Sequence, residues 1–517
     1  MRTVAQRLVE WLKSLDVEMV FGIPGVHTIE LYRALHGSSI RHVTARHEAG
    51  AGFMADGYAR VSGRFGVALV ITGPGVTNIL TPMAQARADS VPMLVISGVN
   101  ARPTLGKGLG HLHELPDQLA LTASLGPAFH LDHAEALPEI LARMGRALTS
   151  GRGGPVHLQI PLDLMDAPVA AVETAATTVT KEPLCIERAR EILTTSRKPV
   201  IVAGGGCRRA EAELRACAEA LGAPVVQTVN ARGLMHGHPL TVPASPSLEP
   251  VRDLIRGADA ILVAGSELGP TDFDMYGGGW LPELSQMVRI DLCATQLSRH
   301  PAAVVLEGDA RALLPQLYGR TTPAADGPQR AGRARVAARA TLSDAMQADL
   351  RMLEALCAAR PGAIVVGDST QAIYAANLYH DHDRPGGWFN AATGYGALGY
   401  ATGAAVGAAL AAPEASVLCL IGDGGLMFAP GEILTAVEER LDITFFVLNN
   451  RGFGEIASAM REAGTEPLGC TPVPPDFEAF AAACGLPFAR CTKRDIVPAL
   501  GTQRGPRMVE VTLPPVA

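Results

Sequence analysis

The sequence predicts an α/β protein of three domains, each a doubly wound parallel sheet with helices on both faces. Short apolar runs end in Gly- and Pro-rich turns and are followed by helical stretches, a pattern typical of strands buried within parallel sheets. The chain has 517 residues, enough for three domains of about 150 residues each. Hydrophobic residues make up 48% and charged residues 18%, which is a globular composition.

The first domain is expected over residues 1–165. It opens with an amphipathic helix at residues 1–16. Its strands are expected in the apolar runs at 19–21, 67–72, 93–97 and 154–164. A linker rich in Ala, Thr and Val follows, from residue 165 to 181.

The second and third domains are expected over residues 182–318 and 337–517, joined by a linker at 318–335 that is dense in Gly, Pro, Ala and Arg. The strands of the second are expected at 199–206, 224–229, 260–268 and 287–292. The third should open with one long helix at 337–360. Its strands are expected at 363–370, 415–425 and 442–450, and in the segment RMVEVTL near the end.

The composition excludes several classes of function. A net charge of −7 and an aromatic content of 5% argue against a nucleic-acid or membrane partner. Nine scattered cysteines without CxxC spacing argue against a disulfide scaffold and a zinc ribbon. The N-terminal segment lacks the apolar core of a signal peptide, and no apolar run is long enough to span a bilayer. A cytoplasmic protein is therefore expected.

Two polar residues follow neighbouring strands of the third domain. Asp423 lies in a Gly-Asp-Gly turn after one buried strand, and Asn450 ends the next, with a helix between them. Such a unit makes a right-handed parallel crossover, so both residues lie at the carboxyl edge, where α/β sheets bind ligands. Carboxylate and amide oxygens suit Mg²⁺, and the glycines let a phosphate approach backbone N–H groups. The alternative is two ordinary turns.

Glu48 is the second candidate. It opens a helix whose next residues are small and apolar, so its carboxylate is expected to be poorly solvated, which raises a pKa and suits proton transfer. The alternative is an acid that interacts with the helix dipole. Downstream, the segment TGPGVTN at 72–78, which includes Gly73 and Asn78, is another glycine turn that enters a helix.

In order and separation, these motifs resemble the thiamine diphosphate-dependent enzymes of the acetolactate synthase and 2-oxo acid decarboxylase group. The resemblance runs nearly end to end: VFGIPG at 20–25, RHEAGAGFMADGYARVSG at 46–63, TGPGVTN, GYGALGYATGAAVGA at 394–408, then GDG and NN. It implies a pyrimidine-binding N-terminal domain, a Rossmann-like middle domain and a diphosphate-binding C-terminal domain.

The resemblance also implies residue roles. Glu48 should hydrogen-bond the aminopyrimidine and favour its imino tautomer, Leu398 should hold the cofactor bent, and the carbonyl of Gly396 should accept from the exocyclic amine. Asp423, Asn450 and the backbone oxygen of Gly452 should hold Mg²⁺. The remaining cofactor contacts are expected from Gly73, Asn78, Ser369, Thr370, Gln371, Gly422, Gly424 and Gly425.

The resemblance leaves the outcome open, because the enamine formed after CO₂ loss is either protonated to an aldehyde or added to a second carbonyl. Three departures weaken the acetolactate synthase alternative. Val99 replaces a Gln, the segment GSELGPTDFDMYG at 265–277 lacks an Arg, and the counterpart of a selecting Trp falls near Ala459. The missing Arg also makes FAD less favoured, although the AGGG turn at 203–206 could face a nucleotide.

The loop at 108–118 is expected to face substrate, together with Val26, Val99 and His27. His111 and His113 join His27 as candidate proton relays. Glu114 and Asp117 are candidates to hold a cationic substrate end, or are merely solvated. These segments are similar to the branch that includes 5-guanidino-2-oxopentanoate decarboxylase.

The favoured function is thus thiamine diphosphate- and Mg²⁺-dependent decarboxylation of a 2-oxo acid through an enamine to an aldehyde. An acetolactate synthase-like carboligase is the alternative. A non-catalytic protein of the same fold is disfavoured because Glu48, Asp423 and Asn450 are intact. The resemblance further implies a homodimer or homotetramer whose active sites lie between subunits.

Overall fold

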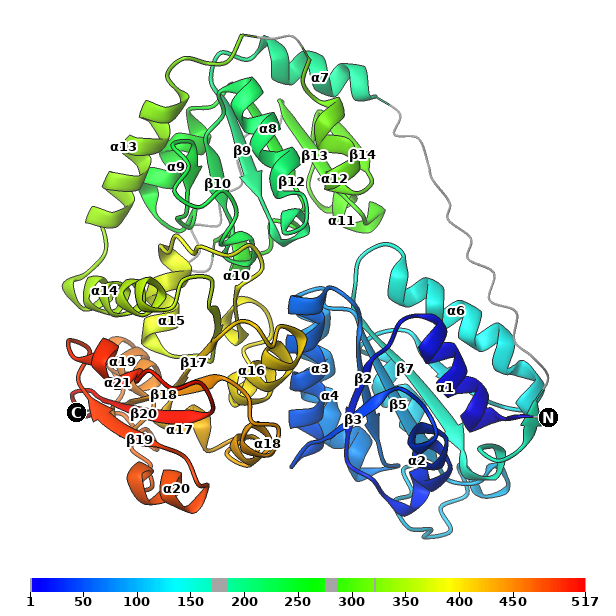
Figure 1. Cartoon of the computed structure of the whole chain (residues 1–517). Helices are drawn as coiled ribbons and strands as arrows, with labels where there is room; N and C mark the ends of the chain where they lie inside the picture. The colour runs from blue at the N-terminus through cyan, green and yellow to red at the C-terminus, as the bar shows by residue number, and fades with distance from the viewer. Residues whose placement is uncertain (1, 170–184, 275–285, 320–321, 517) are drawn as a thin grey trace. The chain divides into compact units, whose positions relative to one another are not determined.

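The computed structural model describes residues 2–169, 185–274, 286–319 and 322–516. They form three six-stranded sheets flanked by helices, which confirms the predicted fold class (Figure 1). The chain divides into two compact units, residues 1–178 with 395–489 and 502–517, and residues 179–394 with 490–501. Within the described ranges, no helix is both long and apolar enough to cross a lipid bilayer.

The first sheet lies in the first unit, and its strand pairs are all parallel. In spatial order its strands are β3 (Arg41–Thr44), β2 (Met19–Gly22), β4 (Gly66–Val70), β5 (Met93–Val99), β7 (Pro155–Pro161) and β6 (Ala128–His130). Its helices are α1 (Val4–Ser14), α2 (Ile29–His36), α3 (Glu48–Ser62), α4 (Pro74–Ala88), α5 (Gln118–Ala123) and α6 (Leu137–Thr149). An antiparallel pair, β1 (Arg2–Thr3) and β8 (Pro168–Val169), lies beside them.

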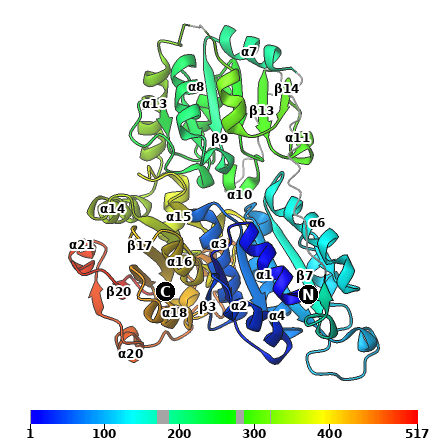
Figure 2. The ribbon, with the colours of Figure 1, turned by 45° about the vertical axis from the view of Figure 1, so that its right-hand side comes forward.

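Helix α3 packs directly against α16 (Tyr400–Ala411), and the two lie side by side in both views (Figures 1 and 2). A Cβ atom at Gly57 would lie 2.0 Å from the carbonyl oxygen of Ala404, and one at Gly407 would lie 1.9 Å from that of Met54. Glycine at 57 and 407 is thus explained by two helix backbones in close contact.

The second sheet belongs to the second unit, and its strands are likewise parallel. Side chains of its central strand alternate between two cores: Ile201 and Ala203 face one, Val200 and Val202 the other. In spatial order its strands are β11 (Thr241–Val242), β10 (Val225–Gln227), β9 (Pro199–Ala203), β12 (Ala260–Ala264), β13 (Met287–Asp291) and β14 (Val304–Glu307). Its helices are α7 (Ile186–Thr195), α8 (Glu211–Leu221), α9 (Glu249–Arg256), α10 (Pro270–Phe273), α11 (Ala294–Arg299) and α12 (Ala310–Leu313).

The third sheet has its strands in the order β16 (Trp388–Asn390), β15 (Ile364–Gly367), β17 (Val417–Gly422), β18 (Ile443–Asn449), β20 (Arg507–Thr512) and β19 (Phe488–Cys491). Strands β17, β18 and β20 pair in parallel. The associated helices are α14 (Asp344–Ala359), α15 (Gln371–Leu378), α17 (Asp423–Leu426), α18 (Glu432–Glu438), α19 (Gly454–Glu462), α20 (Phe477–Ala483) and α21 (Ile496–Ala499), with α16.

The prediction of a single helix at 337–360 is wrong. The structure has two helices, α13 (Gly327–Ala340) and α14, and the Ser343 side chain caps the second by accepting a hydrogen bond from the Met346 N–H at 3.2 Å. Serine favours such a cap over a helix interior. Helix α13 begins inside the predicted linker and packs on the core of the second sheet through Ala331, Ala334 and Ala338.

The predicted domain bounds stay a prediction. Parts of three predicted segments lie outside the described residues: 170–181 of the first linker, 320–321 of the second, and 275–277 of the segment at 265–277.

Candidate active site

Glu48 is the first residue of α3 and is half-buried. The helix is capped by His47, whose Nδ1 accepts a hydrogen bond from the Ala49 N–H at 3.0 Å. The Asn78 amide, from α4, donates to the Glu48 Oε2 at 2.9 Å. The structure therefore joins two of the predicted site residues, and one carboxylate oxygen of Glu48 is held in place by Asn78.

A second carboxylate, missed by the sequence analysis, supports the entry to this helix. Glu432 of α18 is 1% exposed, and its Oε1 accepts from the backbone N–H groups of Arg46 at 3.1 Å and His47 at 3.0 Å. The Thr435 hydroxyl donates to its other oxygen at 3.0 Å. Burial raises the pKa of Glu432, and these hydrogen bonds partly offset the rise. No local sequence signal distinguishes it from any helix-opening Glu.

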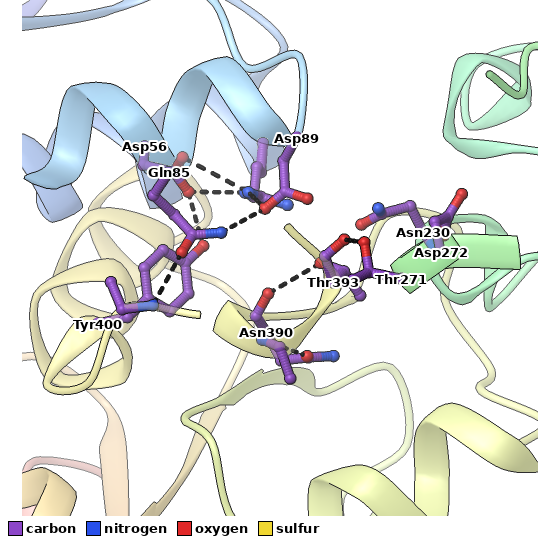
Figure 3. Close-up of polar contacts among 12 residues, drawn as sticks. Asp56, Gln85, Asp89, Asn230, Thr271, Asp272, Asn390, Thr393 and Tyr400 are labelled. Atoms are coloured by element: carbon purple, nitrogen blue, oxygen red, sulfur yellow. Dashed lines mark hydrogen bonds and ion pairs between the residues drawn. The ribbon is translucent and has the colours of Figure 1, made fainter. Parts of the chain in front are cut away.

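A buried polar cluster ties α3 and α4 to the turn before α16 (Figure 3). The Arg60 guanidinium pairs with Asp56 at 2.6 Å and Asp89 at 2.7 Å, and the Tyr400 hydroxyl donates to Asp56 at 2.6 Å. Gln85 accepts from the Ala397 N–H at 3.2 Å. Removing one charged partner of such a buried cluster would leave an uncompensated charge, so the cluster is held as a unit. Its hydrogen bonds to Ala397 and Tyr400 fix the turn that carries Gly396 and Leu398.

His27 and His113 lie together, with ring centroids 5.1 Å apart in an edge-to-face arrangement. The Nδ1 atom of each is buried and has no hydrogen-bond partner in the part of the chain that is described. Burial lowers the pKa of His27, and the proximity of His113 lowers it further, so His27 is neutral near pH 7. The third predicted histidine, His111, is exposed and does not join the pair.

The two loop acids hold backbone groups. The Glu114 carboxylate accepts from the N–H groups of Gly110 at 2.7 Å and His111 at 3.0 Å. Desolvation alone would raise the pKa of Glu114, but these backbone hydrogen bonds hold that pKa below its usual value. Asp117 is exposed and caps α5 by accepting from the Ala120 N–H at 2.9 Å.

Gln118, the last residue of the loop expected to face substrate, anchors the same region, a role that the sequence analysis did not assign. It is 3% exposed; its amide donates to Ser97, to the Gly98 carbonyl and to Gln159, and its oxygen accepts from the Gly73 N–H at 3.0 Å. Gly73 has a φ of +65°, and a Cβ there would lie 2.5 Å from the His113 carbonyl oxygen. Glycine at 73 therefore brings the loop that carries His113 close to the end of β4.

Asp423 lies at the carboxyl end of β17 and is 2% exposed. Its Oδ1 atom has no hydrogen-bond partner among the described residues. Burial raises the pKa of Asp423, and the backbone N–H groups of Asn450, Gly424 and Gly452 offset part of that rise. The structure thus gathers Asp423, Asn450 and Gly452 at one sheet edge, around a buried carboxylate oxygen that fits a hard cation.

The remaining predicted residues lie at sheet or helix ends. Gly396 has a φ of +79° and is exposed, and Leu398 is half-buried in the same turn. Val26 is 63% exposed, whereas Val99 is buried at the end of β5.

Gly422 ends β17, and Gly425 is buried in α17. In the second unit, Ser369, Thr370 and Gln371 follow β15 and lead into α15.

Three domain descriptions of known proteins match this chain in order. The thiamine pyrophosphate enzyme N-terminal TPP-binding domain matches residues 2–121, the central domain 186–317 and the C-terminal TPP-binding domain 367–511. The chain belongs to the thiamine pyrophosphate enzymes. The resemblance predicted from the motifs is confirmed, and thiamine diphosphate is the cofactor.

The relatives of this thiamine pyrophosphate enzyme include one decarboxylase and several synthases. The probable 2-ketoarginine decarboxylase AruI of Pseudomonas aeruginosa is 43% identical over 93% of this chain and 88% of that protein. The acetolactate synthase isozyme 1 large subunit of Escherichia coli is 31% identical over 87% and 82%. The isozyme 2 large subunit is 30% identical over 98% and 95%.

One of these relatives is named as a decarboxylase and the other two as acetolactate synthase subunits. Thiamine diphosphate-dependent decarboxylation of a 2-oxo acid is accordingly the chemistry of this thiamine pyrophosphate enzyme.

Proposed function

We propose that the enzyme releases an aldehyde from a 2-oxo acid that bears a distal guanidinium group. The observation that carries the proposal is the 43% identity, over nearly the whole chain, to a relative named as a 2-ketoarginine decarboxylase. The acidic loop around Glu114 and Asp117 supports it, because a carboxylate there could pair with a cationic substrate end. Asp117 is the better placed of the two, since it is exposed and accepts one backbone hydrogen bond, whereas Glu114 accepts from the N–H groups of Leu109, Gly110 and His111.

Asp423, Asn450 and the carbonyl of Gly452 would hold Mg²⁺, which would supply positive charge for the diphosphate. The unpartnered Oδ1 of Asp423 supports this role. Gly396, Leu398, Gly73, Asn78 and the glycines around Asp423 would contact the rest of the cofactor, and Ser369, Thr370 and Gln371 the diphosphate. When bound, thiamine diphosphate accepts the electron pair released as CO₂ leaves.

Two parts of the protein would transfer protons: Glu48, and the pair formed by His27 and His113. Glu48 would hold a proton at Oε1, because Asn78 already occupies Oε2. His27 and His113 would relay a proton from solvent to the product carbon, each neutral ring giving up its N–H proton as its other nitrogen gains one, and each has a buried ring nitrogen without a partner in the described residues. The exposed His111 is the weaker candidate for this role.

The synthase alternative lacks an evident anchor for a second 2-oxo acid. Val99 is buried in β5, Ala459 is an exposed small residue of α19, and the described part of the segment at 265–277 contains no Arg. A reacting centre with no bound acceptor is protonated instead. FAD is not favoured, because Gly204 and Gly206 are explained by the close approach of Gly265, whose oxygen would lie 2.3 Å from a Cβ at Gly204.

We further propose a cytoplasmic homodimer or homotetramer with active sites between subunits. Nine free cysteines suit a reducing compartment. Large apolar side chains beside the site residues stay exposed in the single chain, namely Val26 at 63%, Tyr395 at 58%, Met427 at 45% and Phe428 at 62%. Burying them against a partner subunit would be favourable.

The assembly is tested by sedimentation at assay concentration. We expect activity to sediment with the dimer or tetramer, and we expect dilution below the dissociation constant to abolish it, because a single chain would not complete the site. Activity that sediments with the monomer would contradict this.

The reaction is tested by product analysis. The purified enzyme is incubated with 5-guanidino-2-oxopentanoate and, separately, with pyruvate, and products are identified by mass spectrometry. We expect the guanidino aldehyde one carbon shorter, at a higher kcat/KM than acetaldehyde from pyruvate. Acetolactate from pyruvate with no aldehyde from either substrate would return the assignment to a synthase.

A matched pair of variants tests the acidic loop in the same assay. Asp117→Asn keeps the helix cap but removes the charge, and Glu135→Gln changes an exposed carboxylate in another segment. Asp117→Asn should lower kcat/KM for the guanidino acid by about 10- to 150-fold, the equivalent of a charge-assisted contact, and leave pyruvate unchanged. Equal effects on both substrates would remove Asp117 from substrate recognition, without affecting the decarboxylase assignment.

A further inference from the structure

A cluster of metal-binding side chains lies in the second unit, among residues given no role above. Cys357 of α14, with His380 and His382 after α15, each place one ligand atom within 4.8 Å of the others. Both histidines are fully buried, at 2% and 0% exposure, and Cys357 is half-buried.

The histidine geometry is that of two metal ligands. The Nε2 atom of His380 lies 3.4 Å from the Nδ1 atom of His382, which is long for a hydrogen bond between neutral rings. Two nitrogens bound at about 2.05 Å to a tetrahedral ion are separated by about 3.4 Å. The observed spacing therefore equals one edge of a tetrahedral coordination shell.

The polar groups around the cluster are also under-satisfied. In the described part of the chain, Nδ1 of His380, Nε2 of His382 and Nε1 of the adjacent Trp388 make no hydrogen bond of normal geometry. The two histidine atoms are the ring nitrogens opposite the His380 Nε2 and His382 Nδ1 pair, and a histidine that binds a metal through one ring nitrogen carries its proton on the other.

Charges of both signs lie near the cluster, including the buried guanidinium of Arg232. Arg339 is paired with Glu354 at 2.5 Å, and His236 with Asp381 at 3.1 Å. Asp383 interacts electrostatically with both Cys357 and His382, and its Oδ1 has no hydrogen-bond partner in the described residues. A divalent ion with one thiolate carries one net positive charge, which the Asp383 carboxylate would offset.

We propose that Cys357, His380 and His382 form a binding site for a borderline-soft divalent cation, best matched by Zn²⁺, with water as the fourth ligand. One sulfur and two imidazole nitrogens are the ligand types that zinc prefers. The site is chemically distinct from the oxygen ligands at Asp423 and Asn450. A bound ion would join α14 to the chain that leads into β16.

Cobalt is the sharpest probe, because Co²⁺ bound to a thiolate gives a sulfur-to-metal charge-transfer band that oxygen ligands at the Mg²⁺ site cannot produce. Co²⁺ is titrated into the chelator-treated full-length protein in the presence of excess Mg²⁺ and thiamine diphosphate. We expect this band to saturate at one equivalent, with tetrahedral visible bands, and Zn²⁺ to displace it.

Variants identify the ligands. Cys357→Ser should abolish the charge-transfer band, and His382→Asn should weaken Co²⁺ binding by at least tenfold. Cys293→Ser, a half-buried thiol of the same unit outside the cluster, should leave the band unchanged. Zinc content of untagged wild type, measured by mass spectrometry after gel filtration, should be about one per chain and should fall in Cys357→Ser.

No charge-transfer band in the wild type, or a band retained by Cys357→Ser, would overturn the proposal. The titration of the wild type tests the metal site even if a variant fails to fold. Far-UV circular dichroism would reveal such a folding defect. Neither result bears on the proposed decarboxylation, since its reaction uses other residues.

Discussion

Glu48→Gln is expected to slow hydrogen exchange at C2 of bound thiamine diphosphate by about 10²- to 10⁴-fold, the usual contribution of a positioned acid–base group. The substitution keeps the size of the side chain and an oxygen that can accept from Asn78. It removes the ability to share a proton with the cofactor ring. The measurement is deuterium exchange followed by NMR after rapid quenching.

Two comparisons make this result specific. Glu135→Gln, an exposed carboxylate of the same unit, should exchange like the wild type. Cofactor affinity of Glu48→Gln should change much less than the exchange rate, because the hydrogen bond from Asn78 is retained. Wild-type exchange in Glu48→Gln would exclude the proposed proton-sharing role.

Asp423→Ala is expected to abolish retention of thiamine diphosphate and Mg²⁺ through gel filtration. The carboxylate would bind the ion that links protein to diphosphate, and one such charged contact contributes about 1.5–3 kcal/mol, so the affinity should fall at least 10-fold. Isothermal titration of the cofactor at fixed Mg²⁺ measures the change. Glu466→Ala, an exposed acid of the same unit, is the control.

The same variant should not lose folding stability without cofactor. Asp423 is buried, and its raised pKa means that the charged form is disfavoured in the folded state. At pH 7, which is above the ordinary pKa of an aspartate, the raised pKa of Asp423 lowers the free energy of unfolding, and removal of the carboxyl should leave that free energy equal or higher. Unchanged cofactor affinity, or a large drop in urea midpoint for the apo protein, would contradict the assignment of a binding site.

Much of the fold followed from the sequence because its central strands are continuous apolar runs. Strands β4, β5, β9, β12, β17 and β18 are buried along nearly their full length, so composition alone marks them. Edge strands gave a weaker pattern: in β14 only alternate residues are buried, and in β19 none is fully buried. Their structure depends on pairing with a neighbouring strand, which no local signal records.

The same reasoning separates the predicted site residues from the missed ones. Asp423 and Asn450 stand at strand ends next to glycine turns, a pattern visible in sequence. Glu432 contacts backbone groups 385 and 386 residues away, and Gln118 bonds Gly73 across 45 residues. Likewise Cys357 and the His380–His382 pair share no recognised metal-binding spacing. Only tertiary structure brings such residues together.

The contact between α3 and α16 has a consequence for how this enzyme can change during evolution. Because backbone oxygens fill the space beside Gly57 and Gly407, any side chain there would force the two helices apart and shift Glu48 with them. New substrate preferences must therefore arise elsewhere, and the exposed positions of the loop from Gly108 to Asp117, which exclude His113, can vary without disturbing that contact. The helix pair that positions Glu48 for every substrate is thus separate from the loop positions that can adapt to a new one.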